Sequence, residues 1–184
     1  RCVNDARRAF TDRGWDSELI VCDNNSTDGT AAIARAAGAR VVFEPVNQIA
    51  RARNTGAAAA DGDWLLFIDA DSYPRPELFA DVASQILSGR CLAGGSTIAY
   101  DSAHRVAILG TAIWNSLSRW RRWPAGSFIF CETAAFRKIA GFSHELFVAE
   151  ELDLGKRLHK LARETGREIA ILHRHPLLTS GRKL

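Results

Sequence analysis

Short apolar runs alternate with helical segments along this chain of 184 residues, and this alternation limits the possible folds more than any other feature. The runs are typical of strands, whereas the segments between them repeat apolar residues at helical spacing. Strands are expected at residues 18–22, 41–43, 64–68, 91–100, 127–131 and 168–172. Helices are expected at residues 1–13, 30–37, 48–60, 77–88, 104–123 and 148–165. Strands separated by helices predict an α/β domain with a mostly parallel, doubly wound sheet and helices on both faces.

The bulk properties are those of a globular protein with one domain. The chain is 47% hydrophobic and 24% charged, and its net charge of +3 gives no case for nucleic acid as a partner. The four cysteines have no metal-binding spacing, so we expect reduced thiols and a cytoplasmic protein. The first ten residues look like the interior of a helix, and we therefore expect that an upstream strand is missing from this chain.

Two carboxylates follow the apolar run Trp64–Ile68. Asp69 and Asp71 come directly after this expected strand, whose lack of polar residues indicates burial on both faces. Ligands of open α/β sheets bind beyond the carboxyl ends of the strands. Paired carboxylates there suit Mg²⁺ or Mn²⁺ holding a diphosphate. A solvated acidic turn is the alternative interpretation, since Asp is common in turns.

A second polar loop follows the strand at residues 18–22. Asp23 and Asn24 begin it, and a helix follows, so two strands bring acidic residues to the same edge of the predicted sheet. This repetition favours a nucleotide site. Arg53, on the helix at residues 48–60, either contacts a phosphate of that nucleotide or is a solvated helical arginine.

The helix at residues 148–165 begins with Glu150 and Glu151. Carboxylates in the first turn of a helix are ordinary partners of the helix dipole, and a functional role is the alternative. Near the end of the chain, His173 and His175 either complete a metal site or lie at the end of a strand. Arg182, in a basic loop, either closes over a diphosphate or is solvated.

The segment 104–123 has an aromatic and basic end. It is interpreted either as a helix packed on the domain or as a surface helix at a membrane interface. In the second interpretation its tryptophans lie in the interface beside neighbouring arginines, which are Arg119, Arg121 and Arg122. The inner face of a membrane is then a possible location.

Three stretches carry a resemblance to a known family. In order, they are ELIVCDNNSTDGT, ARNTGAAAADGDWLLFIDADS and AEELDLGKRL. Together they resemble the nucleotide-sugar glycosyltransferases of family 2, which have the Rossmann-like GT-A fold and invert the anomeric centre. The resemblance implies a nucleotide-diphosphate sugar as donor, a carbohydrate or lipid-linked acceptor, a divalent cation and a role in polysaccharide or cell-envelope biosynthesis.

The resemblance also implies roles for individual residues. Asp23 and Asn24 match the loop that contacts the base. Asp69 and Asp71 match the DxD motif, with Asp69 near the ribose and the metal and Asp71 as the main metal ligand. Glu151 stands where members usually carry the aspartate that acts as catalytic base. The remaining residues assigned to the nucleotide sugar are Arg53, Glu150 and Arg182.

Two other functions are compatible with the same stretches. A haloacid-dehalogenase-type phosphatase also places DxD after an apolar strand, but that strand is normally the first one, whereas two strands precede it here. A non-catalytic module that binds nucleotide sugars is the other alternative, because Glu151 replaces the usual aspartate.

Overall fold

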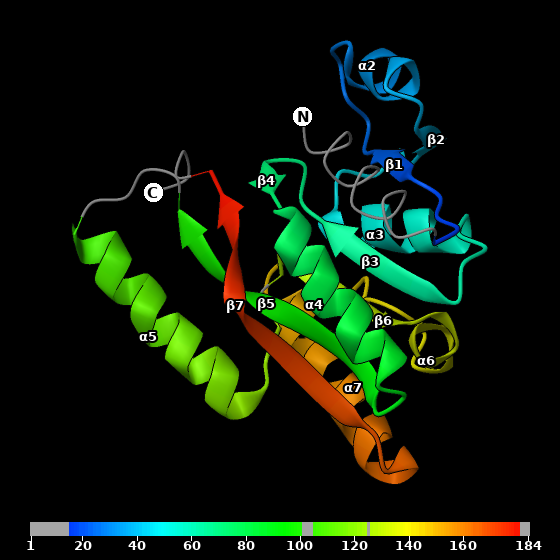
Figure 1. Cartoon of the computed structure of the whole chain (residues 1–184). Coiled ribbons are helices and arrows are strands. Elements are labelled where there is room, and N and C mark those ends of the chain that lie inside the picture. Colours follow the sequence, from blue (N-terminus) through cyan, green and yellow to red (C-terminus); the bar gives the residue numbers. More distant parts are fainter. Residues whose placement is uncertain (1–14, 101–104, 125, 181–184) are drawn as a thin grey trace.

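The computed structural model describes residues 15–100, 105–124 and 126–180, which form an α/β domain (Figure 1). The strands are β1 (Ile20–Asp23), β2 (Arg40–Phe43), β3 (Trp64–Ile68), β4 (Ser72–Tyr73), β5 (Cys91–Tyr100), β6 (Phe128–Glu132) and β7 (Glu168–Thr179). The helices are α2 (Thr30–Ala36), α3 (Ile49–Ala58), α4 (Pro76–Leu87), α5 (Arg105–Arg121), α6 (Thr133–Lys138) and α7 (Glu150–Thr165). The helix expected at residues 1–13 lies outside the described residues.

The strands form two sheets, and the larger one is mixed. β1 and β2 pair in parallel, as expected for strands joined by a helix. The second sheet has the order β3-β6-β5-β7-β4, in which only β5 and β7 are parallel. The prediction of a mostly parallel sheet is therefore wrong. The direction of β6 depends on where the chain re-enters the sheet after α5, and a local apolar pattern carries no information on that point.

Helices cover both faces of the larger sheet, as predicted. α3, α6 and α7 bury one face, and α4 covers the other. β3 contributes to both layers because its side chains alternate: Leu65 and Phe67 join the first cluster, whereas Trp64, Leu66 and Ile68 pack against the second. The expectation that this strand is covered on both faces is confirmed.

The C-terminal strand is longer than predicted. It continues past Pro176 to Thr179, where it pairs with β4, a strand of two residues that local periodicity does not reveal. Leu172 pairs with Ser96 of β5, and the next pair joins Leu177 with Ile98, so the register between β5 and β7 shifts between these two pairs. Such an irregularity accommodates Pro176, which has no N–H for the ladder.

Two findings bear on the other bulk expectations. Within the described part of the chain, no helix is both long and apolar enough to span a membrane. Cys22, Cys91 and Cys131 are free thiols, and Cys2 lies outside the described residues.

Candidate functional site

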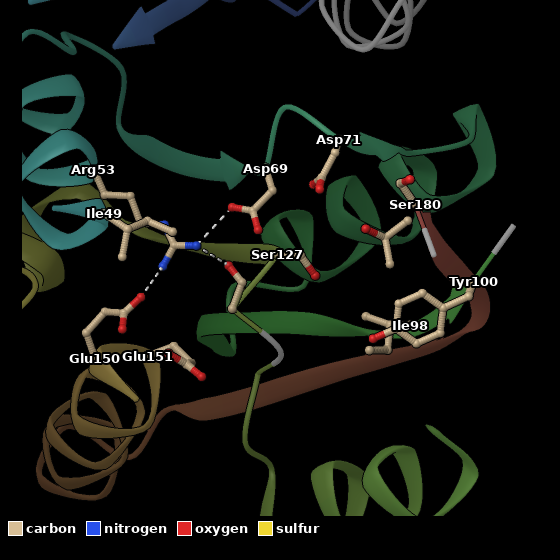
Figure 2. Close-up of a pocket in the computed structure, with 12 residues that line it drawn as sticks. Ile49, Arg53, Asp69, Asp71, Ile98, Tyr100, Ser127, Glu150, Glu151 and Ser180 are labelled. Carbon is tan, nitrogen blue, oxygen red and sulfur yellow. Dashed lines mark hydrogen bonds and ion pairs between the residues drawn. The ribbon is translucent and has the colours of Figure 1, made fainter. Parts of the chain in front are cut away.

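A pocket of about 330 Å³ opens at the carboxyl end of β3 (Figure 2). It gathers residues from α3, from the start of α7 and from the ends of β5 and β7. Its lining residues are Ile49, Arg53, Asp69, Asp71, Ile98, Tyr100, Gly126, Ser127, Glu150, Glu151, Thr179 and Ser180. Five of the predicted site residues therefore lie together.

The turn that carries Asp69 and Asp71 is fixed by backbone hydrogen bonds. The N–H of Ser72 donates to the carbonyl of Asp69 at 3.0 Å, and the N–H of Asp69 donates to the carbonyl of Ser127 at 3.2 Å. The N–H of Ser180 donates to the carbonyl of Asp71 at 3.1 Å. The turn is thus held by strands on either side, and both aspartates line the pocket.

Arg53 joins two carboxylates that lie far apart in the sequence. Its Nη2 lies 3.0 Å from Asp69 Oδ1, and its Nη1 lies 3.1 Å from Glu150 Oε1 (Figure 2). Nη2 also donates to the carbonyl of Gly126 at 2.7 Å, and the guanidinium carbon lies 5.2 Å from the centre of the Phe142 ring. The side chains of Arg53 and Glu150 are only 9% and 7% exposed, so this ion pair is buried. The interpretation of Arg53 as a solvated arginine is therefore wrong.

Glu151 extends from the first turn of α7 into the same pocket. Burial raises the pKa of its carboxyl, and the neighbouring negative charges of Glu150 and Asp69 act in the same direction. Gly126 lies beside it: a Cβ added at Gly126 would come within 3.4 Å of the Cγ and Cδ of Glu151. The two glutamates therefore lie in different environments. Glu150 is bound by Arg53, whereas Glu151 is half-buried at the wall of the pocket.

The acidic turn offers a divalent cation two oxygen ligands. No group of three or more acidic, His or Cys side chains that would hold a metal occurs among the residues that the structure describes. A Mg²⁺ or Mn²⁺ ion that is shared with a diphosphate needs only one or two protein carboxylates, because phosphate oxygens and water complete its shell. Asp69 and Asp71 fit that kind of site.

The loop that is predicted to contact the nucleotide base lies outside the pocket. Asp23 ends β1 and accepts a hydrogen bond from the N–H of Ser26 at 3.1 Å. Asn24 donates to the carbonyls of Glu44 and Val46, at 3.1 and 2.6 Å, and so ties the loops after β1 and β2 together. Neither residue lines the pocket. Their contact with a base stays a prediction.

The remaining C-terminal candidates lie away from the pocket or outside the structure. His175 Nδ1 lies 3.0 Å from Asp81 Oδ2 on α4, and His173 Nδ1 lies 3.4 Å from the carbonyl of Ile171. Both histidines lie within β7, and neither lines the pocket. Arg182 lies outside the described residues.

Several lining residues were not predicted. They include Ile98 and Tyr100, at the end of β5. Thr179 and Ser180, at the end of β7, also line the pocket and belong to the stretch before Arg182 that is predicted to close over a diphosphate. These ends meet because β5 and β7 pair over their whole length, which no local motif indicates.

Comparison with known sequences identifies related proteins. The family model described as "Glycosyl transferase family 2" matches residues 1–144. A TPR repeat-containing protein of Synechococcus elongatus is 42% identical over 77 residues, which are 41% of this chain and 19% of that protein. An uncharacterized glycosyltransferase of Rickettsia conorii is 41% identical over 61 residues, which are 33% of this chain and 22% of that protein. The matches thus cover about a fifth of each of these relatives.

Solved structures share the fold of this chain. Glucosyl-3-phosphoglycerate synthase from Mycobacterium tuberculosis, in complex with Mn²⁺, UDP-glucose and phosphoglyceric acid, superposes with a TM-score of 0.65 at 24% identity. That match covers 98% of this chain and 68% of the synthase. Residues 1–349 of S. aureus TarS give a TM-score of 0.72 at 19% identity and cover 98% of this chain and 57% of that one. At these identities the likeness concerns the fold.

Proposed function

Because this chain belongs to glycosyl transferase family 2 and has the GT-A fold, we propose that its pocket transfers a sugar from a nucleoside-diphosphate donor to an acceptor hydroxyl. The observation that carries the proposal is the convergence of two acidic groups from different elements. Asp69 and Asp71 come from the turn after β3, and Glu151 comes from α7. One group suits a metal-bound diphosphate, and the other suits a proton acceptor.

The acidic turn holds the donor in this proposal. Asp69 and Asp71 would hold a divalent cation, which would neutralise the charge that develops on the departing diphosphate. Asp71 is the main protein ligand in this proposal, as the resemblance to the family implies, and Asp69 also binds Arg53. The synthase structure that contains Mn²⁺ and UDP-glucose supports a cation and a nucleotide sugar as the groups bound by such a fold.

Glu151 acts as the general base. An acceptor hydroxyl is a weak nucleophile near neutral pH, and a carboxylate within hydrogen-bond reach removes its proton as the oxygen attacks C1 of the sugar. The bond between C1 and the phosphate oxygen breaks, and its electron pair leaves with the nucleoside diphosphate. Attack opposite the leaving group inverts the anomeric centre. A raised pKa suits this role, because it makes the carboxylate a stronger base.

Arg53 reduces the negative charge of the pocket and so allows its carboxylates to have different roles. It neutralises Glu150 and one oxygen of Asp69, so that the pocket tolerates several carboxylates at short range. Glu150 is thereby a structural partner, whereas Glu151 is left to face the acceptor.

Release of nucleoside diphosphate tests this function. UDP-, GDP-, dTDP- and ADP-sugars are supplied with Mn²⁺ and a panel of hydroxyl acceptors, and the full chain is compared with Glu151→Gln. We expect one donor class to be consumed, and the turnover number to fall roughly 100- to 10,000-fold in the variant. Matched controls are Glu145→Gln and Glu164→Gln, which change exposed glutamates outside the pocket.

Three outcomes contradict the proposal. Full activity in Glu151→Gln removes the base assignment. Binding of a nucleotide sugar without any turnover favours the non-catalytic module, whereas a phosphorylated Asp69 would favour the phosphatase.

A further inference from the structure

The helix α5 lies at the edge of the molecule, where it stands apart from the other helices (Figure 1). It is fixed to β5 through Asn115, whose side chain pairs with the backbone of Ile98. The Nδ2 of Asn115 donates to the carbonyl of Ile98 at 2.9 Å, and its Oδ1 accepts from the N–H of Ile98 at 3.1 Å. Since Ile98 lines the pocket, α5 is anchored to a wall of the candidate site.

The outer side of α5 exposes large apolar side chains. Ile113 is 62% exposed and Trp120 is 73% exposed. They are seven residues apart, which is two helical turns, so both side chains lie on the same side of the helix. Ile113 and Trp120 thus give the exposed side of α5 an apolar character.

Three exposed arginines lie at the C-terminal end of α5, next to Trp120 in the sequence. They are Arg119, Arg121 and Arg122. The guanidinium carbon of Arg121 lies 4.6 Å from the centre of the Trp120 ring and 5.5 Å from that of Trp123, so a cation is held between two indoles. Aromatic rings beside arginines are the side chains found where water meets the lipid headgroups.

No ion pair neutralises these arginines within the part of the chain that the structure describes. No Asp or Glu occurs in the sequence between Asp101 and Glu132. The end of α5 is therefore a site of concentrated positive charge in a chain whose net charge is only +3.

We propose that this α5 surface, consisting of Ile113, Trp120 and the three arginines, docks on an anionic phospholipid bilayer. The arginines attract the anionic headgroups, and Trp120 and Ile113 enter the interface. The exposed apolar pair favours a bilayer over nucleic acid, because a nucleic acid backbone offers no apolar phase for Ile113. This inference does not depend on the proposed transfer reaction.

Flotation of the full chain with vesicles tests the surface. Vesicles of phosphatidylcholine in which about one lipid in three is phosphatidylglycerol are compared with vesicles of phosphatidylcholine alone. The anionic lipid gives the first vesicles a strong negative surface potential. We expect binding to the anionic vesicles only, and weaker binding at high salt. Arg119→Gln with Arg122→Gln lowers the partition coefficient by about 30-fold, since each arginine near the surface contributes about fivefold. Trp120→Ala lowers it as well.

Matched variants separate this surface from general charge or hydrophobicity. Arg35→Gln with Arg90→Gln removes two exposed arginines from other elements, and Leu87→Ala removes a leucine that is 76% exposed on α4. We expect both to bind vesicles as the parent chain does. Circular dichroism and the urea midpoint confirm that each variant folds.

Three results overturn the proposal. They are the absence of flotation with anionic vesicles, equal losses in the α5 variants and their matched controls, and tight binding of a short oligonucleotide with no binding to vesicles. Binding of a nucleoside diphosphate, measured without vesicles, is expected to be unchanged in the α5 variants. Failure of this surface and failure of the proposed transferase are therefore distinguishable.

Discussion

Replacing Arg53 by methionine tests the buried ion pair at the centre of the pocket. The change removes the cationic partner of Glu150, whose side chain is 7% exposed, and also the donor to the Gly126 carbonyl. Loss of one member of a buried pair costs about 3–5 kcal/mol, because the other charge stays buried without compensation. The second carboxylate, Asp69, contributes less, since it is 30% exposed and water reaches it.

Urea unfolding measures this cost, with an expected fall in the midpoint of about 2 M for a chain of this size. Arg40→Met is the matched control. Arg40 lies 3.9 Å from Glu18 and 3.8 Å from Asp61, but its side chain is 56% exposed, so its loss should cost less than about 1 kcal/mol. In the double variant Arg53→Met with Glu150→Leu, both buried charges are gone and most of the stability returns. A buried ion pair at Arg53 is contradicted if Arg53→Met costs no more stability than Arg40→Met, or if adding Glu150→Leu restores none of it.

Three further predictions concern Glu151 and its surroundings. Burial raises the pKa of Glu151, so its ionised form costs stability at pH values above that pKa, and the cost fades as the pH falls through it. Thermal melts at pH 7.5 should therefore give a higher Tm for Glu151→Gln than for the parent chain, and a lower Tm would contradict the burial argument. In the pH profile of kcat/KM, the loss of activity at low pH should occur at a pH above the ordinary pKa range of a glutamate, and it should be absent in the glutamine variant. A loss of activity at the ordinary pKa would show that another group titrates. Gly126→Ala adds a methyl group 3.4 Å from the Cγ and Cδ of Glu151 and should lower transfer, whereas Gly110→Ala, which has open space around its Cβ position, should not. Equal activity of these two variants would show that a side chain at position 126 does not affect Glu151.

The local parts of the fold and of the site were predictable from the sequence. Trp64–Ile68 is an unbroken apolar run that ends in two carboxylates, and the structure has a strand at these residues with both aspartates in a pocket. The helix that begins at Glu150 was predicted from its leucine spacing, and its burial of Leu154, Leu158 and Leu161 follows from that spacing.

The long-range parts were not predictable. Arg53 and Glu150 are 97 residues apart, and neither position shows by itself that the other will be its partner. The same holds for β6, which enters the sheet between β3 and β5 in the antiparallel direction. Strand order and direction are set by how α4, α5 and α7 pack on the sheet, and periodicity within one segment does not encode that packing.

In the proposed reaction, one pocket separates donor binding from proton removal. The most direct test is calorimetric titration of the full chain with the nucleoside diphosphate of its donor, with and without Mn²⁺. Asp71→Asn is compared with Glu151→Gln, and Asp63→Asn, an exposed aspartate before β3, is the matched control. We expect Mn²⁺-dependent binding to be lost in Asp71→Asn and retained in the other two variants. Retention in Asp71→Asn, or loss in Glu151→Gln, would contradict it.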